Sequence, residues 1–335
     1  MFNKIYENIK KILKENKGSI IFLIITALFF FVELPYYVDA PGSIIDVEDR
    51  IKVENSYNSK GNFYMASVSE IKGILPMLIW ASFDKDMDIV KKEEKIYNNE
   101  TYEEADLRSQ LMLRNSLDNA VLVAYQKAGK EVTMLNEKLY AIVVYEEADT
   151  DLQVGDQILK VDNQDIKTAE DLKNVLATKN FGDKLTILVR RNEKEIKRTA
   201  IVQNIKGEKY LGIGALLDFD IETNPDITFS FKSSESGPSG GLMLSLAIYN
   251  SLVEEDITRG KKIVGTGTID ADGKVGAIGG VKYKIAAAAG EKAEIFIVPK
   301  DNYEEAKKVI EENKYNIKLL VTSSFEETLE KLKQI

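Results

Sequence analysis

Apolar and polar residues follow three different patterns along this chain of 335 residues. A long, mostly apolar run, SIIFLIITALFFFVELPYYV, occupies residues 19–38 and contains one charged residue, Glu33. Residues 104–127 instead place apolar side chains on one broad face of a predicted helix. Short alternating runs such as residues 62–68 predict strands, and residues 205–335 alternate predicted strands and helices. The pattern predicts an α+β chain with a separate apolar segment near its N-terminus.

The apolar run has the length and the flanks of a membrane span. Its 20 residues would extend about 30 Å as a helix, which matches the hydrocarbon core of a bilayer. Residues 1–17 carry a net charge of +3, and Tyr36 and Tyr37 lie at the far end of the run. Basic flanks stay cytoplasmic and tyrosines favour the interface, so we predict a cytoplasmic tail at 1–18 and a single transmembrane helix at 19–38. A signal peptide ending at Val38-Asp39-Ala40 or a buried core helix is the alternative.

After an extracytoplasmic region at 39–130, residues 131–204 read as a compact unit of strands and one helix. The segment LQVGDQILKVDNQDIKTAEDLKNVL, residues 152–176, resembles the second half of a PDZ domain. The resemblance implies binding of an extended peptide as an added strand, and a packing module without a ligand is the alternative. The glycine usual at the carboxylate-binding turn is missing from Lys138–Ala141. The predicted peptide-binding residues are Leu139, Tyr140, Ala141 and Ile142.

The amino-acid composition excludes several kinds of catalytic and metal-binding site. The chain has no histidine and no cysteine, which excludes a Ser-His-Asp triad, a cysteine nucleophile, a disulfide and a His or thiolate zinc site. A formal charge of −9 argues against a nucleic-acid partner. No Gly-x4-Gly-Lys-Ser/Thr phosphate loop occurs in the sequence. We therefore expect no cofactor, no metal and no use of ATP.

A glycine-rich turn presents a candidate nucleophile. The stretch SESGPSGGLML, residues 234–244, places Ser239 directly before an apolar helical run. The start of a helix supplies free amides and a positive potential for a developing oxyanion. We predict that Gly237, Pro238 and Gly240 form the oxyanion and substrate-backbone site around Ser239.

The general base must then be Lys, Asp or Glu. A lysine amine accepts a proton only when neutral, so its pKa must be lowered by burial or by a nearby positive potential. In the second glycine-rich stretch, 273–284, Lys282 lies about 60° from the centre of the predicted apolar face and Lys284 about 100° on the other side. Local geometry prefers Lys282 and leaves Lys284 open.

Two motifs then resemble the proteolytic domain of Lon proteases over residues 205–335: GPSGGLMLSLAIYN and IVGTGTIDADGKVGAIGGVKYKIAAAAGEKAEIFIVP. This resemblance implies a Ser-Lys dyad of Ser239 and Lys282, with Thr266 orienting the amine and Thr268 as the alternate. Many members carry Asp three residues before the serine, where this chain has Ser236. The run DADG at 270–273 lacks the bidentate glutamate of a calcium loop and predicts a tight turn.

The order of these parts resembles membrane-anchored PDZ–Lon proteases of Gram-positive bacteria, and residues 117–131 are also similar to that family. The resemblance implies an ATP-independent endopeptidase, held in the cell membrane with its catalytic domain outside, that cleaves secreted peptides or small membrane proteins. Lon-type domains commonly form rings, which implies a homo-oligomer such as a hexamer. The alternatives are a non-catalytic PDZ peptide-binding protein and a protease limited to self-processing. Residues 39–130 either stand apart or pack on the proteolytic domain.

Overall fold

The computed structural model describes residues 6, 10–11, 13–96, 100–232 and 235–334, and the predicted tail at 1–18 lies partly outside them. The chain divides into two compact units. Unit 1 comprises Met1–Pro41 with Val68–Lys95, and unit 2 comprises Gly42–Ser67 with Ile96–Ile335. Strands β1 (Glu33–Asp46) and β3 (Asn62–Ile74) contribute residues to both.

Unit 1 holds the apolar helix α2 (Lys17–Phe31) and the outer parts of β1 and β3. It also contains α3 (Leu75–Ala81), β4 (Asp88–Lys91) and the 3₁₀ turn η1 (Lys92–Lys95). β4 pairs antiparallel with β1 between Tyr36 and Asp39. The partly buried Lys95 ammonium joins Asp39 of β1 at 2.6 Å and Glu70 of β3 at 2.9 Å, which ties the two strands together in this unit.

The predicted 20-residue helix at 19–38 was wrong at its C-terminal end. The helix ends at Phe31, and Glu33 begins β1. Pro35 explains the stop, because proline cannot continue a helix and pushes the residue before it into extended backbone. In the ranges that the structure describes, no helix combines the length and the apolar character that crossing a membrane requires.

The two alternatives for residues 19–38, a buried core helix and a cleaved signal peptide, also fit the structure poorly. Helix α2 has no buried residue, so it is not a core helix. Val38 and Ala40 are buried within β1, so cleavage after Ala40 would cut through a paired strand. The apolar run therefore divides into an exposed helix and the start of a strand.

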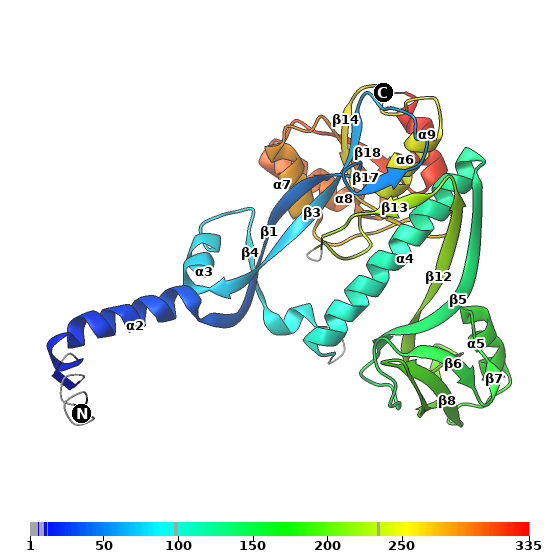
Figure 1. Cartoon of the computed structure of the whole chain (residues 1–335), viewed down its shortest axis with the longest axis horizontal. Helices are drawn as coiled ribbons and strands as arrows, with labels where there is room; N and C mark the ends of the chain where they lie inside the picture. Colours follow the sequence, from blue (N-terminus) through cyan, green and yellow to red (C-terminus); the bar gives the residue numbers. More distant parts are fainter. Residues whose placement is uncertain (1–5, 7–9, 12, 97–99, 233–234, 335) are drawn as a thin grey trace. The chain divides into compact units, whose positions relative to one another are not determined.

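Unit 2 is built on parallel strands that are covered on both faces (Figure 1). The order is β18 (Lys318–Thr322), β17 (Ile295–Pro299), β14 (Lys262–Gly265) and β3, all parallel. Alternate residues of β17 face opposite sides, as strand geometry requires. Ile295 and Ile297 join a core with α6 (Gly241–Leu252) and α9 (Phe325–Leu332). Phe296 and Val298 join a second core with α7 (Val281–Gly290) and α8 (Tyr303–Asn313).

The segments before the PDZ-like unit contribute to this core. Phe63 and Met65 of β3 lie in the same cluster as α6, together with residues of the long helix α4 (Tyr102–Ala128). α4 starts at a capping box of Thr101 and Glu104, and it ends at Gly129 with φ of 65°. Such left-handed glycines commonly end helices. α4 runs beside both α6 and β12 (Figure 1).

The PDZ-like part of unit 2 has its own sheet and its own core. Its sheet order is β12-β5-β6-β8-β9, and β7 pairs with β6. β5 and β12 pair antiparallel along their whole length, from Glu131 opposite Asn224 to Val144 opposite Ile213. Its elements are β5 (Glu131–Val144), β6 (Gln157–Val161), β7 (Gln164–Asp165), α5 (Ala169–Ala177), β8 (Lys184–Arg191), β9 (Lys194–Ile201) and β12 (Ile213–Asn224).

Three short pairs and one turn complete the described chain. The pairs are β10 (Gln203–Ile205) with β11 (Glu208–Tyr210), β13 (Ile227–Phe229) with β2 (Ile51–Val53), and β15 (Thr268–Ile269) with β16 (Val275–Gly276). The 3₁₀ turn η2 (Lys300–Asn302) precedes α8.

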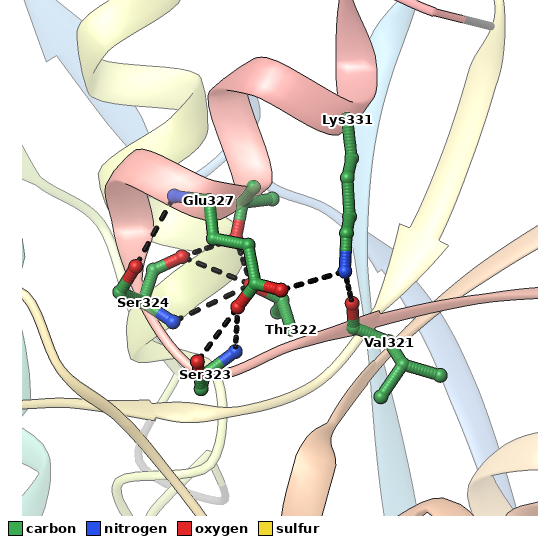
Figure 2. Close-up of polar contacts among 7 residues, drawn as sticks. Val321, Thr322, Ser323, Ser324, Glu327 and Lys331 are labelled. Carbon is green, nitrogen blue, oxygen red and sulfur yellow. Dashed lines mark hydrogen bonds and ion pairs between the residues drawn. The ribbon is translucent and has the colours of Figure 1, made fainter.

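A polar network fixes the last helix, α9, at the end of β18 (Figure 2). The Ser324 hydroxyl caps α9 by accepting the Glu327 amide at 3.1 Å. The Glu327 carboxylate accepts from the Ser323 amide and hydroxyl, both at 2.7 Å, and from Lys331 at 2.7 Å. These donors lower the pKa of Glu327 from its ordinary 4.5 to about 2, Lys331 having the largest effect.

We predict that Glu327→Gln lowers the free energy of unfolding by about 1 kcal/mol at pH 7, because the partly exposed carboxylate loses charged hydrogen bonds. A depressed folded-state pKa stabilises the fold fully above pH 4.5, and this stabilisation is lost as the pH falls towards 2. The difference from wild type should therefore shrink with acid in denaturant titrations. Exposed Glu330 of the same helix is the matched control, and an equal loss in Glu330→Gln would contradict this reading.

Candidate active site

Ser239 lies in a tight turn at the beginning of α6. Gly240 is the N-cap residue of that helix, and Gly237 has φ of 87°, a left-handed conformation that favours glycine. The first amides of a helix have no partner within it, and they carry its positive end. The sequence therefore presents a half-buried hydroxyl where negative charge is stabilised.

The lysine beside this serine is Lys284 of α7. Its Nζ donates to Ser239 Oγ at 2.7 Å and to Thr266 Oγ1 at 3.0 Å. Lys284 is 2 % exposed, and burial lowers the pKa of its amine from 10.5 to about 8. A substantial fraction of this amine is therefore neutral near pH 8, as a general base must be.

The prediction that Lys282 is the buried lysine beside Ser239 was wrong. Lys282 is only partly buried, and its Nζ lies 5.5 Å from the centre of the Tyr283 ring. The buried stripe of α7 contains Val281, Lys284, Ile285 and Ala288, at the spacing of three, four and seven residues typical of one helix face. Lys284 is thus a member of the core-facing stripe, and Lys282 is displaced from it.

Thr266 contacts both Ser239 and Lys284. The sequence predicted a contact between Thr266 and the amine of the dyad lysine, and the structure shows that contact with Lys284 instead of Lys282. Thr266 is fully buried, and its hydroxyl donates to the Ser239 carbonyl at 2.9 Å while accepting from Lys284. The Gly267 amide donates to the same carbonyl at 2.8 Å. Thr268, the alternate, lies in β15 opposite Gly276. Thr266 therefore holds the serine backbone and the lysine amine in one arrangement.

The predicted oxyanion residues have different roles in the turn. Pro238 has no N–H, and its carbonyl accepts the Gly241 amide at 3.2 Å. The Gly237 amide donates to the Ser109 carbonyl of α4 at 3.3 Å. Neither the Ser239 nor the Gly240 amide donates to another group in the part of the chain that the structure describes. These two amides are the candidate oxyanion donors, so Gly240 keeps its predicted place, whereas Gly237 and Pro238 shape the turn.

Sequence reasoning missed an ion pair that precedes the serine. The Arg50 guanidinium binds the Glu235 carboxylate with N–O distances of 2.8, 2.9 and 3.2 Å, and both side chains are largely buried. Ser236, where many Lon proteases have Asp, is exposed. No local pattern identifies Arg50, because it lies 185 residues before its partner.

The predicted peptide-binding strand is an interior strand. Residues Leu139 to Ala141 pair with β12 on one side, and Leu139 and Tyr140 pair with β6 on the other. The prediction of Leu139, Tyr140, Ala141 and Ile142 as the strand-addition site was therefore wrong, because main-chain groups paired on both sides cannot take an added peptide. β12 and β9 are the two edge strands in the sheet order, and β12 is the one that neighbours β5 and contacts α5.

A glycine-containing turn precedes this free edge. Leu211-Gly212-Ile213-Gly214 leads into β12, and Gly212 has φ of 70°. This turn has the glycines that Lys138–Ala141 lack. The pattern LGIG was visible in the sequence, but it follows the last predicted strand of the unit and was assigned to the next domain.

The DADG run is a turn, as expected. The Asp270 carboxylate accepts the amides of Asp272 and Lys274 at 3.1 and 2.8 Å, so it binds its own backbone. Within the described ranges, no group of three or more acidic side chains that could hold a metal ion is present.

Comparison with known proteins assigns the two domain types. Residues 232–334 match the model of the Lon protease (S16) C-terminal proteolytic domain, and residues 122–202 match a PDZ domain model. Lon protease 2 of Borreliella burgdorferi is 33% identical over 119 residues, which is 35% of this chain and 15% of that protein. Lon protease of Campylobacter jejuni is 32% identical over 97 residues, covering 29% of this chain and 12% of that protein.

The chain therefore spans less than a sixth of the length of these two curated relatives. Among solved structures, the PDZ domain of the SdrC-like protein from Listeria monocytogenes is 22% identical, with a TM-score of 0.22. It covers 23% of this chain and 86% of that domain. The C-terminal domain is homologous to the proteolytic domain of Lon proteases, a class of serine peptidase, and it is accompanied by a PDZ domain.

Proposed function

We propose that this protein is an ATP-independent serine endopeptidase that uses Ser239 as nucleophile and Lys284 as general base. The observation that carries the proposal is the 2.7 Å contact between Lys284 Nζ and Ser239 Oγ in a buried environment. With no histidine in the chain, a lysine whose pKa is lowered to about 8 is the base that this serine meets.

The proposed reaction proceeds through an acyl-enzyme. Neutral Lys284 takes the hydroxyl proton as Ser239 Oγ bonds to the substrate carbonyl carbon, and the Ser239 and Gly240 amides donate to the resulting oxyanion. The lysine then gives this proton to the leaving amine as the C–N bond breaks. Water then bonds to the acyl carbon as Lys284 takes its proton. Lys284 gives that proton to Ser239 Oγ as the ester C–O bond breaks, which restores the serine and releases the new carboxylic acid. Thr266 keeps the amine directed at Ser239 throughout.

Substrates are proposed to be extended or loosely folded chains. The sequence contains no phosphate loop of an unfolding motor, and a serine in a turn requires an extended substrate backbone beside it. The free edge of β12, with α5 next to it, is the proposed recruitment site for a peptide that adds as a strand.

The test is cleavage of an unstructured protein by the full chain in mild detergent, without ATP. Products are mapped by mass spectrometry, and Ser239→Ala is the control. Cleavage that disappears with Ser239 supports the proposal. Cleavage only within the enzyme's own chain would favour the self-processing alternative. Absence of Ser239-dependent products from an assembled enzyme, with its oligomeric state measured by light scattering, would favour a non-catalytic peptide-binding protein.

Peptide docking gives a separate prediction. A peptide with an apolar C-terminus should shift the amide NMR signals of residues 212–216 and of α5, because strand addition takes place at a free edge. The signals of residues 139–142 should shift much less, since these residues lie inside the sheet. The isotope-labelled full chain in detergent micelles is titrated with the peptide. Shifts centred on residues 139–142 would contradict the assignment of β12.

Attachment to the cell membrane through α2 is the proposed location. α2 has no buried residue. An apolar helix without a protein cover is typical of one surrounded by lipid. Loss of the full chain from membranes after an alkaline wash would contradict this location. The helix exposes Ile21, Phe22, Leu23, Ile24, Ile25, Leu28, Phe30 and Phe31.

A further inference from the structure

Helix α4 lies outside the matched Lon region, and it carries polar side chains within its buried face. We propose that Ser116 of α4 is a positioning residue for Ser239, because it holds the Pro238 carbonyl directly before the nucleophile. This inference rests on the proposed function of Ser239.

The contact is short and enclosed. Ser116 is 2 % exposed, and its hydroxyl donates to the Pro238 carbonyl at 3.1 Å. A Cβ added to Gly241, the first residue of α6, would lie 2.5 Å from Ser116 Oγ. The Ser116 hydroxyl therefore lies against the start of α6, the helix that presents Ser239. No side chain larger than that of glycine fits at position 241 beside it.

α4 holds the nucleophile turn at more than one point. The Ser109 carbonyl accepts the Gly237 amide at 3.3 Å, two helical turns before Ser116 and on the same face. Three residues after Ser116, the Asn119 side chain donates to the Ile269 carbonyl at 3.2 Å. Ile269 belongs to the segment that follows Thr266 and Gly267. One helix face thus fixes the backbone before Ser239 and the strand beside it.

The helix is itself anchored to β12. The Asn115 amide donates to the Leu217 carbonyl of β12 at 2.6 Å, and Arg114 donates to the Asp220 carboxylate at 2.9 Å. A helix held by β12 as well as by the nucleophile turn provides a fixed support for Ser116. Since a misplacement of about 1 Å at a catalytic group can cost about 100-fold in rate, this support matters for attack by Ser239.

Removal of the hydroxyl has an effect distinct from general destabilisation. The Pro238 carbonyl keeps the Gly241 amide as a partner in Ser116→Ala, so no buried carbonyl is left without a hydrogen bond. The turn instead loses its tie to α4. Ser245 of α6 offers the matched control: it is fully buried, and its hydroxyl donates to the Leu242 carbonyl of its own helix at 2.8 Å.

The experiment compares Ser116→Ala with Ser245→Ala in the full chain, using kcat, KM and amide hydrogen exchange of residues 235–244. We expect Ser116→Ala to lower kcat about 10- to 100-fold with little change in KM, and to speed exchange of the Gly237 and Gly241 amides. Ser245→Ala should leave both readouts close to wild type.

Two results would overturn the proposal: unchanged kcat and exchange in Ser116→Ala, or equal losses in both variants, which would mean that the core has merely loosened. Hydrogen exchange needs no catalysis. A wild-type chain that cleaves nothing would therefore refute the proposed function, while the exchange of Gly237 and Gly241 would still decide whether Ser116 positions the turn.

Discussion

Replacing Lys284 by methionine is expected to lower kcat/KM by at least about 1,000-fold, whereas Lys282→Met should remain within a few-fold of wild type. Methionine keeps the length and much of the apolar volume of the side chain, and it removes the amine that contacts Ser239 at 2.7 Å. The side chain of Lys282 is only partly buried, and its Nζ lies 5.5 Å from the centre of the Tyr283 ring. The two lysines are two residues apart on one helix, so each variant serves as the control for the other.

The measurement is cleavage of a fluorogenic unstructured peptide by both variants, with circular dichroism to establish that each is folded. Lys284→Met is expected to be at least as stable as wild type at pH 7, because it removes a buried cation. Full activity in Lys284→Met together with inactive Lys282→Met would refute the assignment of the base.

The second large effect is on the pH dependence of kcat/KM. The reaction requires the neutral amine of Lys284, whose pKa is lowered by burial to about 8. The amine is protonated below this pH, so the rate should fall about tenfold for each pH unit below 8 and reach a plateau above it. Between pH 9 and pH 6 the expected loss is about 100-fold.

Two carboxyl groups titrate in a similar range and must be distinguished from the lysine. Burial is the largest cause raising the pKa of Asp118 and of Glu48 to about 7. The inflection near pH 8 should persist in Asp118→Asn and in Glu48→Gln. Disappearance of the inflection in either variant, or a rate that does not change between pH 6 and 9, would contradict Lys284 as the base.

The nucleophile could be predicted from the sequence, whereas its base could not be assigned correctly. Ser239 is found by its glycine-rich turn before an apolar run, which is a local signal. Local geometry gave only a preference for Lys282, which the resemblance to Lon proteases then assigned, and that preference depended on which residues define the buried face of α7. The predicted face included Ala289, which moved the centre of that face towards Lys282. The observed buried stripe instead contains Val281, Lys284, Ile285 and Ala288, at the spacing of three, four and seven residues expected for one helix face.

Tertiary pairing limited the prediction of the peptide site. The apolar run Tyr140–Val144 correctly predicts a strand, but such a run does not tell an edge strand from an interior one. β12 is an edge strand because β5 is its one neighbour in the sheet order, and this pairing joins strands separated by residues 145–212. Ser116 and Asn119 gave a weaker signal: they are polar residues on the buried face of a predicted amphipathic helix, and their partners lie far along the chain.

The pairing of β5 with β12 makes the PDZ-like module an inserted domain that could be exchanged for another. The chain leaves the proteolytic core at Lys138 and returns at Asp218, and these two residues face each other across a ladder that starts at Glu131 and Asn224. A two-residue Asn-Gly hairpin turn could join them directly, because neighbouring antiparallel strands are only about 5 Å apart. The position between Lys138 and Asp218 is therefore an insertion site, at which another peptide-binding domain could replace the PDZ-like one without a change in the catalytic core.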